Sequence, residues 1–349
     1  MMDTNFITND KIIYHQQQLG SWLKGQAVNP ITVEIHLTEK CNNRCFYCNY
    51  EKSNKEMCFK DFKKAVKKLS EIKVKGLIFS GGGDPLLYAQ LSSALRLTAS
   101  YKIDAAIITN LLSEDAVKFQ AILKNCLWCR ISLDSSNRSV YRKIRGTDSF
   151  DRVIRNINSL VKMKKKEDSS TTLGVQSVVN RYNYKDIFDE IKMVSEFGVD
   201  YFQIRPVETK LNERLKYSKK QYDQVLDQVE KGRRYERRDF KIIWSQKWDT
   251  LNPYKKNRKH GFSFCHAYQM ILAIDVSGDA YACCHQIENK NQELLYGNIF
   301  RQPIKKIMSC RKEKIKKIDL TKCYLECRAS SINKYLEKFK KTTEHKNFL

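Results

Sequence analysis

Residues 41–48 read Cys41-Asn42-Asn43-Arg44-Cys45-Phe46-Tyr47-Cys48, directly after the first strand-like run of the chain. Three thiolates at this spacing on one loop can bind three corners of a cubane 4Fe–4S cluster, which ordinarily takes four thiolates. The fourth iron would then be open to a small molecule that carries an amine and a carboxylate. The alternatives are a zinc knuckle or chance clustering, although no nearby His or Cys completes a tetrahedral zinc site at finger-like spacing.

Around this loop, short β-branched runs alternate with longer amphipathic segments. The strand-like runs are residues 31–38, 76–80, 104–110, 128–134, 172–179 and 201–207, and the helical patterns are residues 59–72, 85–100, 113–123, 150–165 and 184–197. Strands and helices that alternate at this spacing predict βαβ units and a parallel sheet. We therefore expect an α/β fold with a partial (β/α)6 TIM-like barrel.

Several predicted strands alternate between apolar and polar residues, whereas parallel strands that are covered on both faces are usually apolar throughout. The apolar face can pack under the helices, which leaves the polar face for a lumen that holds a ligand. A polar residue of a barrel can also serve only to hold its own strands together. With that alternative open, the candidate substrate residues are Glu34, His36, Gln176, Gln203 and Arg205.

The pattern changes after about residue 208, and a new cysteine-rich region begins at Cys265. Within it, residues 270–276 and 280–284 flank Ser277-Gly278-Asp279, which is a hairpin signal because glycine suits a tight turn between strands. The expected organisation is an N-terminal extension (1–28), a barrel core (29–215), a helical linker (216–262), a small domain with a β-hairpin and a helix (263–337) and a polar tail (338–349).

The composition narrows the class of protein. The chain has 349 residues and 64 Lys and Arg against 39 Asp and Glu, which gives a formal net charge of +25. This excess predicts a solvated, Lys-rich surface or a preference for an anionic substrate, and we do not expect a nucleic-acid partner because no basic patch is interleaved with aromatic residues. The start lacks a signal-peptide pattern and no apolar run is long enough to span a membrane, so we expect a cytoplasmic protein. Twelve cysteines in a reducing compartment indicate metal binding or redox chemistry and not disulfides.

Other motifs follow the next predicted strands in order. Ser80-Gly81-Gly82-Gly83-Asp84-Pro85 comes after the second strand, Thr109-Asn110 ends the third, Ser132-Leu133-Asp134 ends the fourth, and Arg145 follows in the segment 141–146. Together with the cysteine loop, these motifs resemble the radical S-adenosylmethionine (SAM) superfamily, whose signature is this cysteine spacing after the first barrel strand. The family usually has Glu where this chain has Asp84.

The resemblance implies roles for these residues. It implies that Cys41, Cys45 and Cys48 bind a 4Fe–4S cluster whose open iron holds SAM. The glycine-rich segment would meet the amino group of SAM, the serine its carboxylate or ribose, and the arginine its carboxylate, for which a planar guanidinium is suited. The alternative for Arg145 is a surface salt bridge. The implied SAM-binding residues are Gly82, Gly83, Asp84, Asn110, Ser132 and Arg145.

The second cysteine set resembles the Twitch version of the SPASM extension, which holds one auxiliary 4Fe–4S cluster. The implied ligands are Cys265, Cys283, Cys323 and Cys327. Cys284 could replace Cys283, although the spacing from Gly278 favours Cys283. The alternative is a structural zinc site.

As the resemblance implies, SAM is reductively cleaved to a 5′-deoxyadenosyl radical, which abstracts a hydrogen atom from a substrate in the barrel. An electron donor such as flavodoxin or ferredoxin would supply the reductant. We expect a two-electron oxidation, of the dehydrogenase type, of a small polar metabolite such as a sugar or cyclitol derivative. The alternatives are modification of a peptide, epimerisation with Cys284 or Cys310 as hydrogen donor, and a zinc-stapled binding protein without catalysis.

Overall fold

A computed structural model describes residues 11–207, 218–245, 247–248, 252–254, 260–325 and 327–340. The described residues form a ten-stranded sheet with the order β10-β9-β8-β1-β2-β3-β4-β5-β6-β7. Every neighbouring pair from β1 to β7 is parallel, and β8 is also parallel to β1. The strands are β1 (Thr32–Ile35), β2 (Gly76–Phe79), β3 (Asp104–Thr109), β4 (Cys126–Ser132), β5 (Thr172–Val179), β6 (Tyr201–Pro206), β7 (Lys241–Trp244), β8 (Ile271–Ile274), β9 (Asp279–Tyr281) and β10 (Leu295–Asn298).

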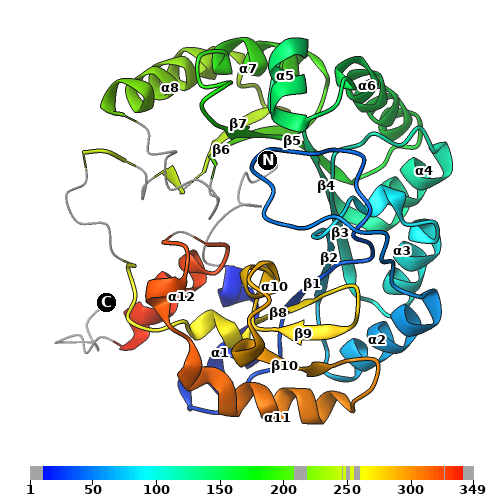
Figure 1. Cartoon of the computed structure of the whole chain (residues 1–349), viewed down its shortest axis with the longest axis vertical. Helices are drawn as coiled ribbons and strands as arrows, with labels where there is room; N and C mark the ends of the chain where they lie inside the picture. The colour runs from blue at the N-terminus through cyan, green and yellow to red at the C-terminus, as the bar shows by residue number, and fades with distance from the viewer. Residues whose placement is uncertain are drawn as a thin grey trace.

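Helices connect the parallel strands and lie along the outer side of the curved sheet (Figure 1). The α-helices are α1 (Gln16–Leu23), α2 (Phe59–Glu71), α3 (Leu91–Ser100), α4 (Ala116–Asn125), α5 (Arg138–Arg145), α6 (Phe150–Lys166), α7 (Ile187–Glu196), α8 (Lys219–Gly232), α10 (Cys284–Glu288), α11 (Ile304–Lys314) and α12 (Ser330–Lys340). Short 3₁₀ helices are η2 (Lys11–Tyr14), η3 (Pro85–Leu87), η4 (Arg233–Tyr235), η5 (His266–Gln269), η6 (Gln292–Leu294), η7 (Ile315–Lys317) and η8 (Leu320–Lys322).

Helix α2 shows how the sequence builds this layer. Its buried residues Phe62, Ala65, Val66 and Leu69 recur at the helical period and pack in the core that includes the apolar side chains of the sheet. The lysines between them lie on the other face of the helix and are mostly exposed. The lysines of α2 thus place part of the positive charge of the chain on a helix face that is exposed to solvent.

The predicted α/β fold class is confirmed, and all six predicted strands are present. The structure adds a seventh parallel strand, β7, within the segment for which the sequence predicts a helical linker. The run Lys241–Trp244 is only four residues long and has no clear alternation, so its pairing with β6 depends on tertiary contacts. The expected boundary between residues 215 and 216 lies outside the described residues, as does the expected tail beyond residue 340.

The C-terminal segment continues the sheet of the barrel. Strand β8 pairs with β1 in the register Thr32↔Ile271, and it forms the predicted hairpin with β9. Gly278 in the turn has a φ of +84°, where a side chain is strained, and a Cβ there would also overlap the ring of Phe300. Helices α10 and α12 lie on the inner side of the ring of strands, opposite α2 to α8 (Figure 1). None of the helices in the described part of the chain is long and apolar enough to cross a membrane.

Candidate functional site

The loop that carries the first three cysteines spans residues 38–56 and is here called the cysteine loop. It follows β1, and its two ends are joined by an antiparallel bridge between Thr38 and Glu56. Backbone hydrogen bonds from Glu39 N to Lys55 O and from Met57 N to Leu37 O close the base of the loop. The loop therefore begins and ends at the carboxyl end of β1, where ligands bind in parallel α/β sheets.

Two glycines allow other segments to approach the cysteine loop closely. A Cβ at Gly83 would overlap the carbonyl group of Lys40, at 2.7 Å from its carbon, and a Cβ at Gly146 would lie 2.7 Å from the carbonyl oxygen of Arg44. Gly146 also ends α5 with a φ of +68°. Next to these glycines, Asp84 N donates to Lys40 O and Arg44 N donates to Arg145 O, each at 2.8 Å. The glycines thus fix where the loop lies.

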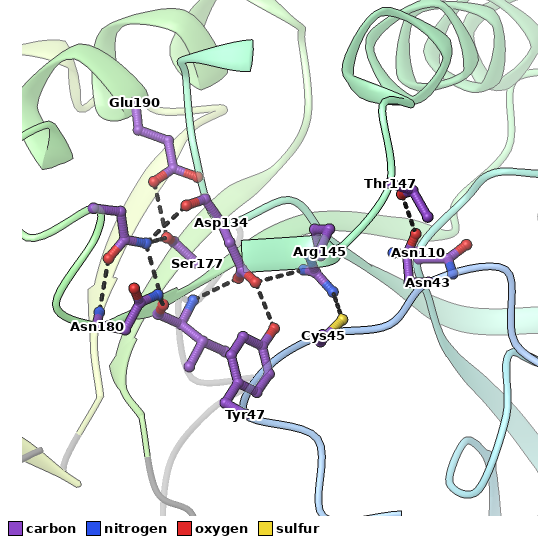
Figure 2. A network of polar contacts seen from close by, with 12 residues as sticks. Asn43, Cys45, Tyr47, Asn110, Asp134, Arg145, Thr147, Ser177, Asn180 and Glu190 are labelled. Atoms are coloured by element: carbon purple, nitrogen blue, oxygen red, sulfur yellow. Dashed lines mark hydrogen bonds and ion pairs between the residues drawn. The ribbon is translucent and has the colours of Figure 1, made fainter. Parts of the chain in front are cut away.

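A buried polar network holds Cys45 from the side of β4 (Figure 2). Arg145 Nη1 lies 3.5 Å from Cys45 Sγ, and Arg145 Nη2 lies 2.9 Å from Asp134 Oδ2. Asp134 also accepts hydrogen bonds from Val178 N at 2.8 Å and from the hydroxyl of Tyr47, two residues after Cys45. Arg145 is therefore a buried ion-pair partner and not the surface salt bridge that was the alternative for it.

Asp84 connects the glycine-rich segment to the end of β3. Its carboxylate accepts hydrogen bonds from Asn110 N at 2.6 Å, Thr109 Oγ1 at 2.8 Å and Leu86 N at 2.9 Å. Burial raises the pKa of this carboxyl, while the donated hydrogen bonds act in the opposite direction. The Asn110 amide in turn donates to Asn42 at 2.7 Å and lies 3.9 Å from Cys41 Sγ. The shorter Asp side chain is thus fully engaged in joining two barrel loops.

These elements surround a cavity of about 670 Å³, here called the central cavity. The three cysteines of the cysteine loop line it, and so do residues from β7, α10 and the segment before α12. Of the predicted SAM-binding residues, it is lined by Gly83, Asp84, Asn110, Ser132 and Arg145, and of the predicted substrate residues by Glu34, Gln176, Gln203 and Arg205. The polar faces that the strand alternation predicts do meet in one cavity.

Among the predicted SAM-binding and substrate residues, His36 and Gly82 do not line the central cavity. His36 is buried, and its Nδ1 accepts a hydrogen bond from Gly82 N at 3.2 Å. A Cβ at Gly81 would overlap the His36 ring, so the imidazole occupies the space that this glycine leaves. Gly82 O accepts a hydrogen bond from Lys52 Nζ at 2.7 Å. His36 and Lys52 therefore hold the glycine-rich segment through the backbone of Gly82.

The second cysteine set comes together from three segments. The pKa of Cys265 is raised to about 12, mainly by burial, and the nearby Cys327 and Cys323 contribute to this rise. Burial also raises the pKa of Cys283, and Cys327 and Cys265 are again among the neighbours that contribute. Asn333 Nδ2 lies 3.5 Å from Cys265 Sγ, and Ser330 Oγ lies at the same distance from Cys327 Sγ. The four predicted ligands are therefore neighbours in space.

Neither cysteine set is arranged around a single ion, since no three His, Cys, Asp or Glu side chains in the described part of the chain are placed to hold one metal ion. The donor chemistry fits iron–sulfur clusters, because thiols are the ligands and hydrogen-bond donors stand beside the sulfurs. Arg145 and Asn110 donate toward sulfurs of the cysteine loop, and Ser330 and Asn333 donate toward sulfurs of the second set.

Sequence reasoning leaves Cys284 and Cys310 as equivalent spare thiols, and the structure separates them. Cys284 begins α10 and lines the central cavity. Cys310 lies on α11, away from the lining residues. Arg328, which directly follows Cys327, also lines the cavity and pairs with Glu34 of β1. Sequence reasoning missed Arg328 as a site residue, because only the fold shows that the second cysteine set faces the barrel lumen.

Comparisons with known proteins agree with this geometry. Residues 35–191 match the family profile described as the radical SAM superfamily, and residues 265–329 match an iron–sulfur cluster-binding domain, SPASM. The first of these segments is a radical SAM domain and the second a SPASM domain. The family implies that Cys41, Cys45 and Cys48 would hold the SAM-binding 4Fe–4S cluster and that the second set would hold an auxiliary cluster.

Individual relatives are distant. A probable GTP 3′,8-cyclase of Saccharolobus islandicus is 27% identical over 173 residues, which cover 48% of this chain and 54% of the relative. The chain thus spans about half the length of such curated relatives. The mycofactocin maturase MftC of Mycolicibacterium smegmatis is 24% identical over 285 residues, covering 77% of this chain and 67% of MftC.

Solved structures share the fold at low sequence identity. Streptococcus suis SuiB, in a crystal structure with its precursor peptide SuiA, has a TM-score of 0.64 and 17% identity over 87% of this chain and 71% of SuiB. The protein anSMEcpe with bound AdoMet has a TM-score of 0.63 and 18% identity over 87% of this chain and 88% of its own. These likenesses establish the architecture of the barrel and its extension.

Proposed function

We propose that this chain is an enzyme that cleaves SAM reductively and oxidises a small polar substrate held in the central cavity. One observation carries the proposal: Cys41, Cys45 and Cys48 line the same cavity as Cys327 of the second set. Held by Cys41, Cys45 and Cys48, the first cluster would supply the electron for reductive cleavage of SAM, the chemistry by which a hydrogen atom would be removed from the substrate. An auxiliary cluster beside Cys327 would then be placed to accept the second electron of an oxidation.

The chain's own residues would position the reactants and exclude water, since the cofactors carry the difficult chemistry. Arg145 and Asn110 would stabilise the cluster by donating to Cys45 and Cys41. Ser132 lies on the cavity wall and would contact the carboxylate or ribose of SAM. Arg145 is already paired with Asp134, so a contact from it to the SAM carboxylate would have to share the guanidinium between two carboxylates.

Epimerisation is a second candidate, and the position of Cys284 favours it. A thiol on the cavity wall could return a hydrogen atom to a substrate radical, and Cys284 lies there while Cys310 does not. The arrangement also favours Cys283 as the auxiliary ligand, because Cys283 is close to Cys265 and Cys327 and is not among the residues that line the cavity.

A peptide substrate is a third candidate, favoured by the relatives. MftC is named a maturase, and SuiB has been crystallised with a precursor peptide. Peptides are therefore tested as substrates together with sugars, cyclitols and amino sugars.

The test is anaerobic incubation of the reconstituted chain with reductant, SAM and each substrate in deuterated buffer. Oxidation predicts 5′-deoxyadenosine together with a product that lacks two hydrogen atoms and carries no deuterium. A product of unchanged composition with one deuterium from solvent would overturn oxidation in favour of epimerisation, and Cys284→Ser should then abolish the deuterium uptake. If the wild-type chain forms no 5′-deoxyadenosine at all, the whole proposal fails.

A further inference from the structure

The middle segments of three neighbouring strands, β4, β5 and β6, together build one wall of the central cavity. In the strand register, Gly174 of β5 pairs with Arg130 of β4 on one side and with Tyr201 of β6 on the other. Two residues nearer the carboxyl ends, Gln176 of β5 pairs with Gln203 of β6. Gly174 has no side chain, and the ring of Tyr201 fills the space that a Cβ there would need. Arg130 Nη1 reaches across β5 and donates a hydrogen bond to Gln203 Oε1 at 3.2 Å.

Two polar atoms on this wall have no hydrogen-bond partner within the described residues. They are Nε of Arg130, a donor, and Oε1 of Gln176, an acceptor. Gln176 is 5% exposed, and both side chains line the cavity. Buried polar groups in proteins are almost always paired, because an unmade hydrogen bond costs the desolvation of the group. A donor and an acceptor left open in the lining of one cavity indicate a ligand.

The charge of this region is positive. Arg205 and Arg328 line the same cavity as Arg130, and Glu34 is the carboxylate that pairs with Arg328. In the described chain, no carboxylate forms an ion pair with Arg130. The pKa of Arg130 is lowered to about 10, mainly by burial, and the positive charges of Arg328 and Arg205 act in the same direction while Tyr201 and Glu34 act against it. The guanidinium remains charged at neutral pH, and a negative group placed against it would be stabilised.

We propose that Arg130 binds an oxyanion group of the substrate, a carboxylate or a phosphate, and that Gln176 accepts a hydrogen bond from a hydroxyl or amine of the same molecule. A planar guanidinium pairs with either oxyanion through two parallel hydrogen bonds. Because SAM must share the cavity, the substrate is a compact acidic molecule. This assignment rests on the proposed function in taking the central cavity as the substrate site.

The test uses inorganic phosphate and malonate as probes on the anaerobically reconstituted chain with SAM. The melting midpoint is measured against the concentration of each anion at constant ionic strength, with chloride as the reference. A ligand that binds the folded state raises the midpoint, and the stabilisation grows with the logarithm of its concentration relative to its Kd. Phosphate and malonate distinguish a phosphate from a carboxylate substrate. We compare the wild type with Arg130→Gln and with Arg96→Gln, which removes an exposed arginine on α3.

We expect at least one probe to raise the wild-type midpoint and Arg130→Gln to weaken its affinity about 10- to 100-fold, as for the loss of a hydrogen bond to a charged group. Arg96→Gln should bind as the wild type does. Should Arg130→Gln not fold, Arg130→Lys keeps the charge but loses the planar fork, and it should still weaken binding. The assignment would be overturned if neither probe raised the melting midpoint more than chloride does. It would also be overturned if Arg96→Gln weakened the binding of a probe as much as Arg130→Gln does.

The formation of 5′-deoxyadenosine by the wild-type chain is measured separately. Binding of a probe without 5′-deoxyadenosine would refute the proposed function and leave the oxyanion site standing. The formation of 5′-deoxyadenosine without probe binding would refute the oxyanion site alone.

Discussion

Replacing Asp134 with Asn tests the buried network behind Cys45. Asp134 has no exposed surface, and the side chain of its partner Arg145 is 5% exposed. The Asn side chain removes the counter-charge of Arg145 and places an amide where the carboxylate accepts hydrogen bonds from Tyr47 and Val178. Breaking a buried ion pair by removing one partner costs about 3–5 kcal/mol.

The matched control is Asp151→Asn. Asp151 pairs with Arg138 on the surface, where the two side chains are 47% and 58% exposed. An exposed pair of this kind contributes about 1 kcal/mol or less. The same chemical change should therefore have effects that differ several-fold, and the difference isolates burial as the cause.

The assay is urea unfolding of the reconstituted chain, followed by circular dichroism under anaerobic conditions. With an m-value of about 3 kcal/mol/M or more for a chain of this size, the midpoint of Asp134→Asn should fall by roughly 1 M. The midpoint of Asp151→Asn should fall by a small fraction of that. If the two variants unfold at the same urea concentration, the buried network does not stabilise the site as we argue.

Three further predictions follow from the site. Gly83→Ala should prevent incorporation of the first cluster, because its Cβ would overlap a backbone carbonyl of the cysteine loop. In Gly82→Ala the nearest atom to the new Cβ belongs to the flexible Glu39 side chain at 3.2 Å, and its backbone contacts are of ordinary length, so equal iron contents in the two variants would contradict this. Burial raises the pKa of Glu190 to about 8, so the folded state holds a proton that the unfolded state releases above its lower pKa, and stability must fall as the pH rises from about 4.5 to 8. The free energy of unfolding should fall by at most about 1.4 kcal/mol per pH unit. Glu190→Gln removes the titrating group, so it should unfold at higher urea than the wild type at pH 8 and its stability should depend less on pH. An unchanged pH profile would refute the raised pKa of Glu190. Finally, Cys283→Ser should lower the iron content by about one cluster per chain, while Cys284→Ser should retain the iron of both clusters. If iron analysis gave the reverse pattern, Cys284 and not Cys283 would be the auxiliary ligand.

The sequence predicts the elements of the barrel well, because its strands and amphipathic helices carry clear local periodicity. The run Phe59–Glu71, for example, repeats apolar residues at the helical period. Strand β7 has only four residues, so its place in the sheet depends on contacts that no local pattern encodes. The cysteine spacing likewise predicts both cysteine-rich segments.

The support of the site was harder to predict. Arg130 shares a polar strand face with Ser132, a signal that was available, but its link across β5 to Gln203 requires the register of three strands. Arg328 reaches the lumen only because the second cysteine set folds against the barrel. His36 has the alternation of a lumen residue, yet it lies behind Gly81. The alternation of polar and apolar residues predicts the strand face on which a residue lies, but it does not predict whether the side chain reaches the cavity.

The most direct measurement is electron paramagnetic resonance of the reduced, reconstituted chain with and without SAM, in the wild type and in a variant with Cys41, Cys45 and Cys48 all replaced by Ala. We predict that SAM changes the wild-type signal, since one iron of the first cluster is open to it. The variant should keep only the signal of the auxiliary cluster, unchanged by SAM. A wild-type signal that ignores SAM, or a variant signal that responds to it, would contradict the assignment of the cysteine loop.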